Sequence, residues 1–214
     1  MRVRRPSLVH PPGIAQRLLE WLRGRDQMLL RPAGELPLLL LSFPRGGQAA
    51  AREIEAAYTR TLPGLRPETR APYEPVFRSL PVMVAVLLRP VNPCGCLGHH
   101  HPRGAESRFA RRLSADLGHP IAEIDLAYEG IRDWQPEPLS SLAAGDLGGR
   151  MRELHFQAAV LAVLLHEMEH LTFPDRSETE IRARSNEFYA MTMRELVAAE
   201  SGAYYGMASP PPRP

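Results

Sequence analysis

The sequence has no lysine, so all 26 of its basic residues are arginines. The absence of lysine excludes a phosphate-binding loop of the Walker type, a Schiff base and a serine–lysine dyad. A net charge of +2 offers no strong field that would attract a polyanion. One arginine cluster, formed by Arg103, Arg108, Arg111 and Arg112, belongs to no recognised nucleic-acid-binding module. We therefore expect no nucleic-acid partner.

Long apolar runs are also missing, and cysteine is scarce. No stretch approaches the roughly 20 residues of a membrane-spanning helix, and residues 1–13 lack the apolar segment of a secretory signal. Cys94 and Cys96 are the only cysteines, and one intervening residue is too few for an unstrained disulfide. We interpret them as ligands or buried thiols and expect a cytoplasmic protein with no membrane partner.

The most informative motif is His-Glu-Met-Glu-His at residues 166–170. A helix turns about 100° per residue, so His166 and His170 lie on one face, where both can bind a single zinc ion. Glu167 is the candidate general base, which would deprotonate a zinc-bound water molecule. The preceding apolar residues 154–165 contain no glycine or proline, and they predict a buried helix that carries the motif at its C-terminal end.

The rest of the chain predicts an α+β fold, in which a small mixed sheet packs with helices. The helix of the motif is followed by a capping-box pattern at Ser177–Glu180, which predicts a second helix to about residue 199. Residues 129–149 are rich in Pro, Gly, Ser and Asp, and we expect an irregular loop. The elements expected before this loop are helices at 14–22, 48–60 and 105–117, buried strands at 36–43 and 81–88, and a strand with one solvent-exposed face at 121–128.

These elements fit one domain of ordinary size. We expect a catalytic domain over residues 14–205, in which 14–128 form an α/β part and 149–200 form a helical hairpin at the metal. Residues 1–13 are expected to be a flexible arm, and the proline-rich residues 206–214 a disordered tail.

Catalytic zinc usually has three protein ligands, so the histidine pair requires a third. Glu180 is the first candidate, because a short turn between antiparallel helices would place it opposite the metal. Its competing role is to complete the capping box with Ser177. Glu187 lies two turns further along the same face, where a surface ion pair with Arg184 or Arg194 is the alternative.

Cys96 is the remaining candidate for the third ligand. It belongs to a run of metal-binding residue types, Cys94-x-Cys96-x-x-His99-His100-His101, which we expect to form a loop just after a predicted strand. This cluster either completes the main site, binds a separate metal, or consists of buried thiols beside solvated histidines. His155 falls three turns from His166 on the helix, too far to share the metal, and is interpreted as a hydrogen-bonded histidine at a helix start.

The motif and the helix after it resemble the zincin superfamily of metallopeptidases. In the glutamate-zincins the third ligand comes from a downstream helix, a position that Glu180 or Glu187 matches. A second resemblance is to peptide deformylases, in residues 95–97, 166–171 and 173–176. That resemblance implies Cys96 as a ligand, although Glu169 stands where the family has aspartate and the gap from Cys96 to His166 is longer.

We therefore predict a zinc-dependent metallopeptidase that hydrolyses a bond in a peptide or protein substrate. The first alternative is a deformylase-like amidase in which Cys96 is the third ligand. The second is a non-catalytic domain in which a fourth protein ligand completes the coordination of a structural zinc ion, so that no position is left for catalysis.

Overall fold

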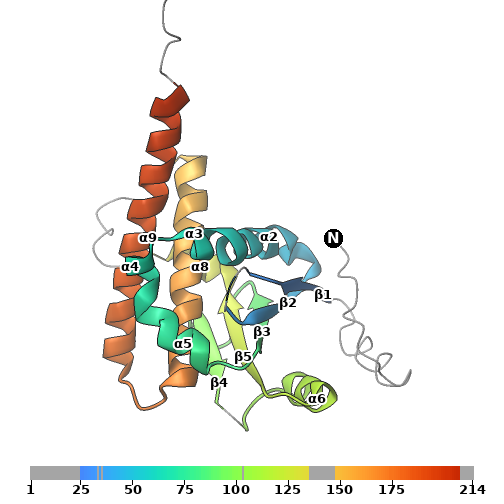
Figure 1. Cartoon of the computed structure of the whole chain (residues 1–214). Coiled ribbons are helices and arrows are strands. Elements are labelled where there is room, and N and C mark those ends of the chain that lie inside the picture. Colours follow the sequence, from blue (N-terminus) through green and yellow to red (C-terminus); the bar gives the residue numbers. More distant parts are fainter. Residues whose placement is uncertain (1–24, 33, 35, 103, 135–147, 208–214) are drawn as a thin grey trace, which may run out of the picture.

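The computed structural model describes residues 25–134, except 33, 35 and 103, and residues 148–207. Within these ranges the chain forms one mixed sheet with helices on both of its faces (Figure 1). The predicted α+β class is confirmed. The expected arm at 1–13, the expected helix at 14–22 and residues 208–214 of the expected tail lie outside the described residues. Residues 206 and 207, which were also assigned to the tail, instead continue the last helix.

The sheet has five strands in the order β1-β2-β3-β5-β4. Its three central strands, β2 (Leu38–Pro44), β3 (Met83–Arg89) and β5 (Ile121–Ala127), are parallel to one another. The edge strands β1 (Arg25–Leu30) and β4 (Gly98–His101) each pair antiparallel with their single neighbour.

The three strands expected from the sequence correspond to β2, β3 and β5, but both edge strands were missed. A parallel strand buried on two faces has a continuous apolar run, which makes it recognisable. An edge strand needs no such run, and β4 consists of one glycine and three histidines. The residues interpreted as a loop cluster at 98–101 therefore belong to the sheet.

The main hydrophobic core lies between one face of the sheet and helices α2 (Gln48–Ala56) and α8 (Gly149–Thr172). A π-helical turn (Ala57–Thr61) and the short α3 (Leu62–Gly64) continue α2. Residues 158–165 of α8 are all buried, as the apolar run predicts. The strands contribute alternate residues to this core, including Leu39, Leu41, Val84, Val86, Ile124 and Leu126.

The opposite face of the sheet packs against α6 (Arg108–Leu117), where Phe109 and Leu113 cover Ala85 and Ile121. The predicted helix at 105–117 is thereby confirmed. Its ends follow from local chemistry, because the Ser107 hydroxyl accepts a hydrogen bond from the N–H of Ala110 and Gly118 adopts a left-handed conformation with φ of 68°.

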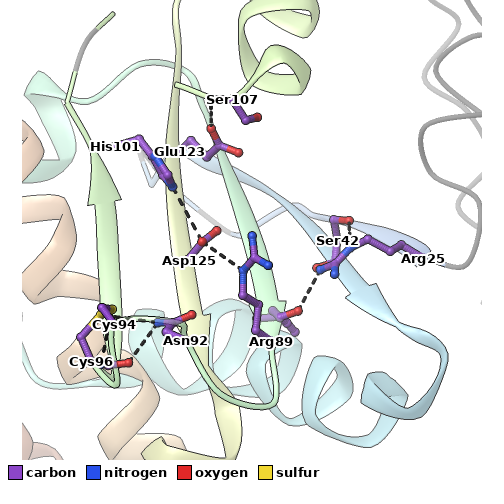
Figure 2. Close-up of polar contacts among 11 residues, drawn as sticks. Arg25, Ser42, Arg89, Asn92, Cys94, Cys96, His101, Ser107, Glu123 and Asp125 are labelled. Carbon is purple, nitrogen blue, oxygen red and sulfur yellow. Dashed lines mark hydrogen bonds and ion pairs between the residues drawn. A yellow bond between two sulfur atoms is a disulfide. The ribbon is translucent and has the colours of Figure 1, made fainter. Parts of the chain in front are cut away.

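The alternating sequence of β5 predicted one solvent-exposed face, but the strand is buried on both faces. All seven of its residues are buried, and Glu123 and Asp125 point to the face that α6 covers in part. A Glu123 oxygen accepts the N–H of Ser107 at 2.6 Å, and Asp125 accepts a hydrogen bond from Arg89 at 3.1 Å (Figure 2). The alternation therefore reflects two buried carboxylates that each accept a hydrogen bond, rather than a solvated surface.

Residues 129–149 were expected to form a loop, but their first part is helix α7 (Tyr128–Asp133). Its one fully buried side chain, Ile131, anchors the turn to the main core. Residues 135–147 lie outside the described residues. The remaining short helices are η1 (Arg45–Gly47), α4 (Pro67–Arg70), η3 (Ala71–Tyr73) and α5 (Glu74–Ser79).

A turn at residues 173–177 joins α8 to the long helix α9 (Glu178–Met207), and the two pack side by side as a hairpin (Figure 1). The Ser177 hydroxyl accepts the N–H of Glu180 at 3.2 Å, which is one half of the predicted capping box. None of the described helices has both the length and the apolar character needed to cross a membrane.

Candidate metal centre

Helix α8 carries the two histidines of the motif one turn apart, as the spacing predicts. Their rings have centroids 4.9 Å apart, and the two Nε2 atoms are separated by 3.2 Å. Both nitrogens therefore face a common point beside the C-terminal end of α8. Two imidazoles can approach in this way when at least one is neutral, which is also the form that binds metal.

Glu178, the first residue of α9, brings a third potential ligand atom to this point. Its Oε2 lies 2.9 Å from Nε2 of His170 and 3.5 Å from Nε2 of His166. Its other oxygen accepts a hydrogen bond of 2.9 Å from Arg182, one turn later on α9. The short α8–α9 turn thus brings a carboxylate from one helix to two imidazoles on the other.

The three separations fit a single zinc ion. Ligand atoms about 2.0 to 2.1 Å from zinc at tetrahedral angles lie about 3.3 Å from one another. The observed separations are 3.2 Å between the imidazoles and 2.9 and 3.5 Å from each imidazole to the carboxylate. Two histidines and one carboxylate are also a donor set that catalytic zinc commonly uses.

A further contact fixes the orientation of the His166 ring. Its Nδ1 lies 3.3 Å from the Ser185 hydroxyl, which donates its own proton to the Arg182 carbonyl at 3.0 Å. The hydroxyl oxygen therefore accepts, and Nδ1 of His166 carries the proton. Its Nε2 is left with a free electron pair directed at His170 and Glu178, as a metal-binding imidazole requires.

The electrostatics of the site favour the charge states that bind a cation. Burial lowers the pKa of His166 below 6.5, so this imidazole is neutral near pH 7. Partial burial works to raise the pKa of Glu178, but the hydrogen bond from Arg182 and the two imidazoles outweigh it and lower that pKa. Glu178 is therefore ionised, and its negative charge lies beside the neutral imidazole of His166.

The candidate general base, Glu167, lies against the edge strand β4. It is only 6% exposed, and its Oε2 lies 2.9 Å from Nδ1 of His100. An ionised carboxylate can only accept, so His100 donates. The His100 ring also stacks on His170, with centroids 4.8 Å apart. A Cβ atom at Gly98 would lie 2.5 Å from Oε1 of Glu167, so only glycine leaves room for the carboxylate in this position.

Glu169, the fourth residue of the motif, holds the hairpin together. Its side chain is fully buried and forms ion pairs with Arg176 in the turn and with Arg184 on α9. The Arg176 guanidinium also stacks over the Phe173 ring, 4.0 Å from its centroid. A buried carboxylate held from both sides fixes how the turn leaves α8, and thereby where Glu178 lies.

The two glutamates predicted from the sequence lie elsewhere. Glu180 follows Glu178 by two residues, or about 200° around the helix, so the two side chains leave opposite sides of α9. The Glu180 side chain is 55% exposed and lies 3.8 Å from Arg176. Glu187 is exposed as well, and neither residue belongs to the group of ligand atoms around His166 and His170.

Cys96, the third predicted candidate, is bonded to Cys94 in a disulfide. This finding corrects the expectation that one intervening residue is too few for a disulfide, because the turn between the two cysteines brings their sulfurs together. The two cysteines form a group of potential ligands with His99, and not with His166 or His170. The deformylase-like arrangement, with Cys96 beside the motif histidines, is therefore not the one that the fold assembles.

Three residues of the site were not predicted from the sequence. His100 was assigned to a histidine-rich loop, although alternation along a strand would have separated it from its neighbours. Glu178 was overlooked because the length of the α8–α9 turn was not known from the sequence. The turn is short, so the first residue of α9 reaches the two histidines. Ser185 had no sequence feature that indicated a role, beyond its spacing of one helical turn from Arg182 and two turns from Glu178.

His155 is hydrogen-bonded to the Tyr189 hydroxyl at 2.7 Å, as expected.

Comparisons with known proteins add no assignment. No protein-family model matches the chain, and comparisons with curated proteins and with solved structures give no match.

Proposed function

We propose that the protein is a zinc-dependent metallohydrolase that cleaves peptide bonds. The observation that carries this proposal is the convergence of His166, His170 and Glu178 at the spacing of zinc ligands, with Glu167 buried next to the first of them. Among the described residues this group has three members, which is the number that leaves a position for substrate or water. A structural zinc site would need a fourth.

Each residue has a distinct role in the proposed reaction. His166, His170 and Glu178 hold the zinc ion. When bound, zinc supplies a Lewis acid that polarises a carbonyl group and lowers the pKa of a water molecule to about 7. The Glu167 carboxylate would accept a proton from the attacking water molecule and give it to the leaving nitrogen as the C–N bond breaks. His100 donates to Glu167 and holds the carboxylate in place between these transfers.

The sheet supports a peptide as the substrate class. Strand β4 is an edge strand of the sheet, so one side of its backbone faces away from β5. Two of its residues face the candidate base on α8: the His100 side chain contacts Glu167, and Gly98 leaves room for the carboxylate. An extended peptide pairing along this edge would therefore place its carbonyl groups near the metal position.

Metal analysis combined with a general-base variant tests the proposal. In full-length protein whose disulfide is intact, we expect about one zinc ion per chain after chelator treatment and zinc addition, and none in His166→Ala. A library of internally quenched peptides serves as substrate, and a formyl-methionyl peptide tests the deformylase alternative.

Glu167→Gln should keep its zinc and lose about 10²- to 10⁴-fold in hydrolysis, because only proton transfer is removed. Glu180→Gln is the matched control and should behave as the wild type. The proposal fails if wild-type protein binds no zinc, or if Glu167→Gln hydrolyses peptides at the wild-type rate. Release of formate without peptide cleavage would favour the deformylase alternative.

A further inference from the structure

We propose that Cys94, Cys96 and His99 form a second metal site, which is closed by the disulfide and opens for a thiophilic cation such as Zn²⁺ when the disulfide is reduced. This site is separate from the group of His166, His170 and Glu178, and the inference does not rest on the proposed hydrolase activity. Thiolate sulfur and imidazole nitrogen are the ligands that zinc prefers.

The three side chains already lie within reach of one ion. The two sulfurs and a ring nitrogen of His99 all lie within 4.8 Å of one another, and the sulfurs are bonded to each other. Cys94 and His99 are exposed, and Cys96 is partly exposed, so an ion or a reductant has access from solvent. Two thiolates and one neutral imidazole would balance the charge of a divalent cation.

The loop that carries the cysteines is anchored without help from the disulfide. Backbone hydrogen bonds join Gly95 to Asn92, Ala127 to Leu97 and Glu129 to Pro90 at 2.8 to 3.2 Å. Asn92 is 3% exposed, and its side chain donates to the Cys96 carbonyl at 3.0 Å (Figure 2). Gly95 has φ of +71°, the left-handed conformation that makes the tight turn possible without strain. The ligands are therefore held close together when the S–S bond opens.

Two N–H groups are already directed at the sulfurs. The backbone N–H of Cys96 donates to Sγ of Cys94 at 3.4 Å, and the Asn92 amide donates to Sγ of Cys96 at 3.9 Å. Hydrogen bonds of this kind stabilise a thiolate over a thiol and orient it toward a metal. A disulfide sulfur gains much less from such donors, because it has no negative charge.

Opening of the disulfide is a two-electron reduction. A dithiol reductant such as dithiothreitol supplies two electrons and two protons, is itself oxidised to a cyclic disulfide, and leaves Cys94 and Cys96 as thiols. Binding of Zn²⁺ then displaces the two thiol protons and forms two Zn–S bonds and one Zn–N bond to His99. A water molecule or an added ligand completes four-coordination.

Titration with Co²⁺ tests this site in the full-length chain. Cobalt bound by thiolate gives a charge-transfer absorption in the near ultraviolet, whereas cobalt bound by histidine and carboxylate does not. We expect the absorption in reduced protein, saturating at about one ion per chain, and its absence in oxidised protein. Added Zn²⁺ should remove the band, because zinc binds such ligands more tightly than cobalt.

Variants separate the two sites. The His166→Ala variant should keep the absorption, so a failure of the hydrolase proposal leaves this one intact. The His99→Ala variant should raise the Kd for cobalt by more than about tenfold, which is the typical effect of losing even an indirect metal contact. The control, His119→Ala, alters an exposed histidine outside both groups and should not change the Kd.

The proposal is overturned if reduced wild-type protein shows no thiolate band. It is also overturned if the band survives in Cys94→Ser/Cys96→Ser, or if His99→Ala and His119→Ala bind cobalt equally well. The His99→Ala variant keeps both thiols, so it tests the site even if the double cysteine variant does not fold.

Discussion

Two clusters of histidines meet near the metal position, and they differ in the element that carries them. His166 and His170 lie on helix α8, where four residues make about one turn and both rings face the same point. His99, His100 and His101 lie on strand β4, where neighbours point to opposite faces. Three consecutive histidines are therefore divided between two surroundings, whereas two separated histidines act together.

The division along β4 gives each histidine a different role. His100 contacts Glu167 and His170 on the side of α8. His101 lies on the opposite face, 3.8 Å from Asp125 (Figure 2). His99 lies at the disulfide and completes the second ligand group. Side-chain periodicity, rather than closeness in sequence, decides which residues share a site, and the comparisons of Glu178 with Glu180 and of His100 with His101 below test that rule.

The largest effect is expected at Glu178, compared with Glu180 on the other side of α9. Glu178→Ala removes one of the three proposed metal ligands, so the Kd for zinc should rise by more than about 100-fold and hydrolysis should be lost with it. Glu180→Ala should leave the Kd unchanged. Competition with a chromophoric chelator measures both. A larger loss in Glu180→Ala would show that the helix presents the other carboxylate to the metal.

The next effect is expected at Gly98, on the face of β4 that meets α8. In Gly98→Ala the new Cβ would lie 2.5 Å from Oε1 of Glu167, so the carboxylate must move. We expect hydrolysis to fall about 100-fold, as for loss of a general base, while zinc content stays at the wild-type level. Gly46→Ala is the control, because nothing lies within 4 Å of its Cβ position. Equal activity in the two variants would contradict the contact.

A smaller effect is expected at His100, compared with His101 on the opposite face. His100→Ala removes a hydrogen bond to a charged group, which typically contributes about 1.5 to 3 kcal/mol, so kcat/KM should fall about 10- to 100-fold. His101→Ala should change kcat/KM much less, because its nearest charged partner is Asp125. Steady-state kinetics of both variants on the same peptide measure this difference.

The smallest effect is a change in how stability depends on pH. Burial lowers the pKa of His155 below its ordinary value of 6.5. The unfolded chain then binds a proton more readily than the folded one, so the contribution of His155 to stability is complete above pH 6.5 and declines as the pH falls below it. The urea midpoint of His155→Gln, measured with a chelator present, should therefore fall less between pH 7.5 and 5.5 than that of the wild type. An identical fall in both proteins would contradict the burial of this imidazole.

The sequence predicted those elements whose residue pattern is compatible with only one local structure. The apolar runs predicted β2, β3 and α8, and the spacing of four placed His166 and His170 together. The third ligand could not be predicted in the same way, because it depends on the length and direction of the α8–α9 turn. The Glu169 ion pairs with Arg176 and Arg184 set that direction, and such contacts between distant residues leave no local pattern.

The same limit applies to β4 and β5. Four residues that include three histidines resemble a metal-binding loop, and only pairing with β5 makes them a strand. The alternation in β5 correctly predicted a strand but suggested the wrong surroundings. Burial of Glu123 and Asp125 depends on Ser107 and Arg89, which come from other elements of the chain.

The central claim is that His166, His170 and Glu178 are the ligands of one zinc ion. A crystal structure of the zinc-loaded protein, with anomalous data collected at the zinc edge, tests it most directly. We predict an anomalous peak about 2.0 to 2.2 Å from the Nε2 atoms of both histidines and from a carboxylate oxygen of Glu178. A zinc ion bound instead by Glu180, Glu187 or Cys96, or no peak beside the two histidines, would contradict the claim.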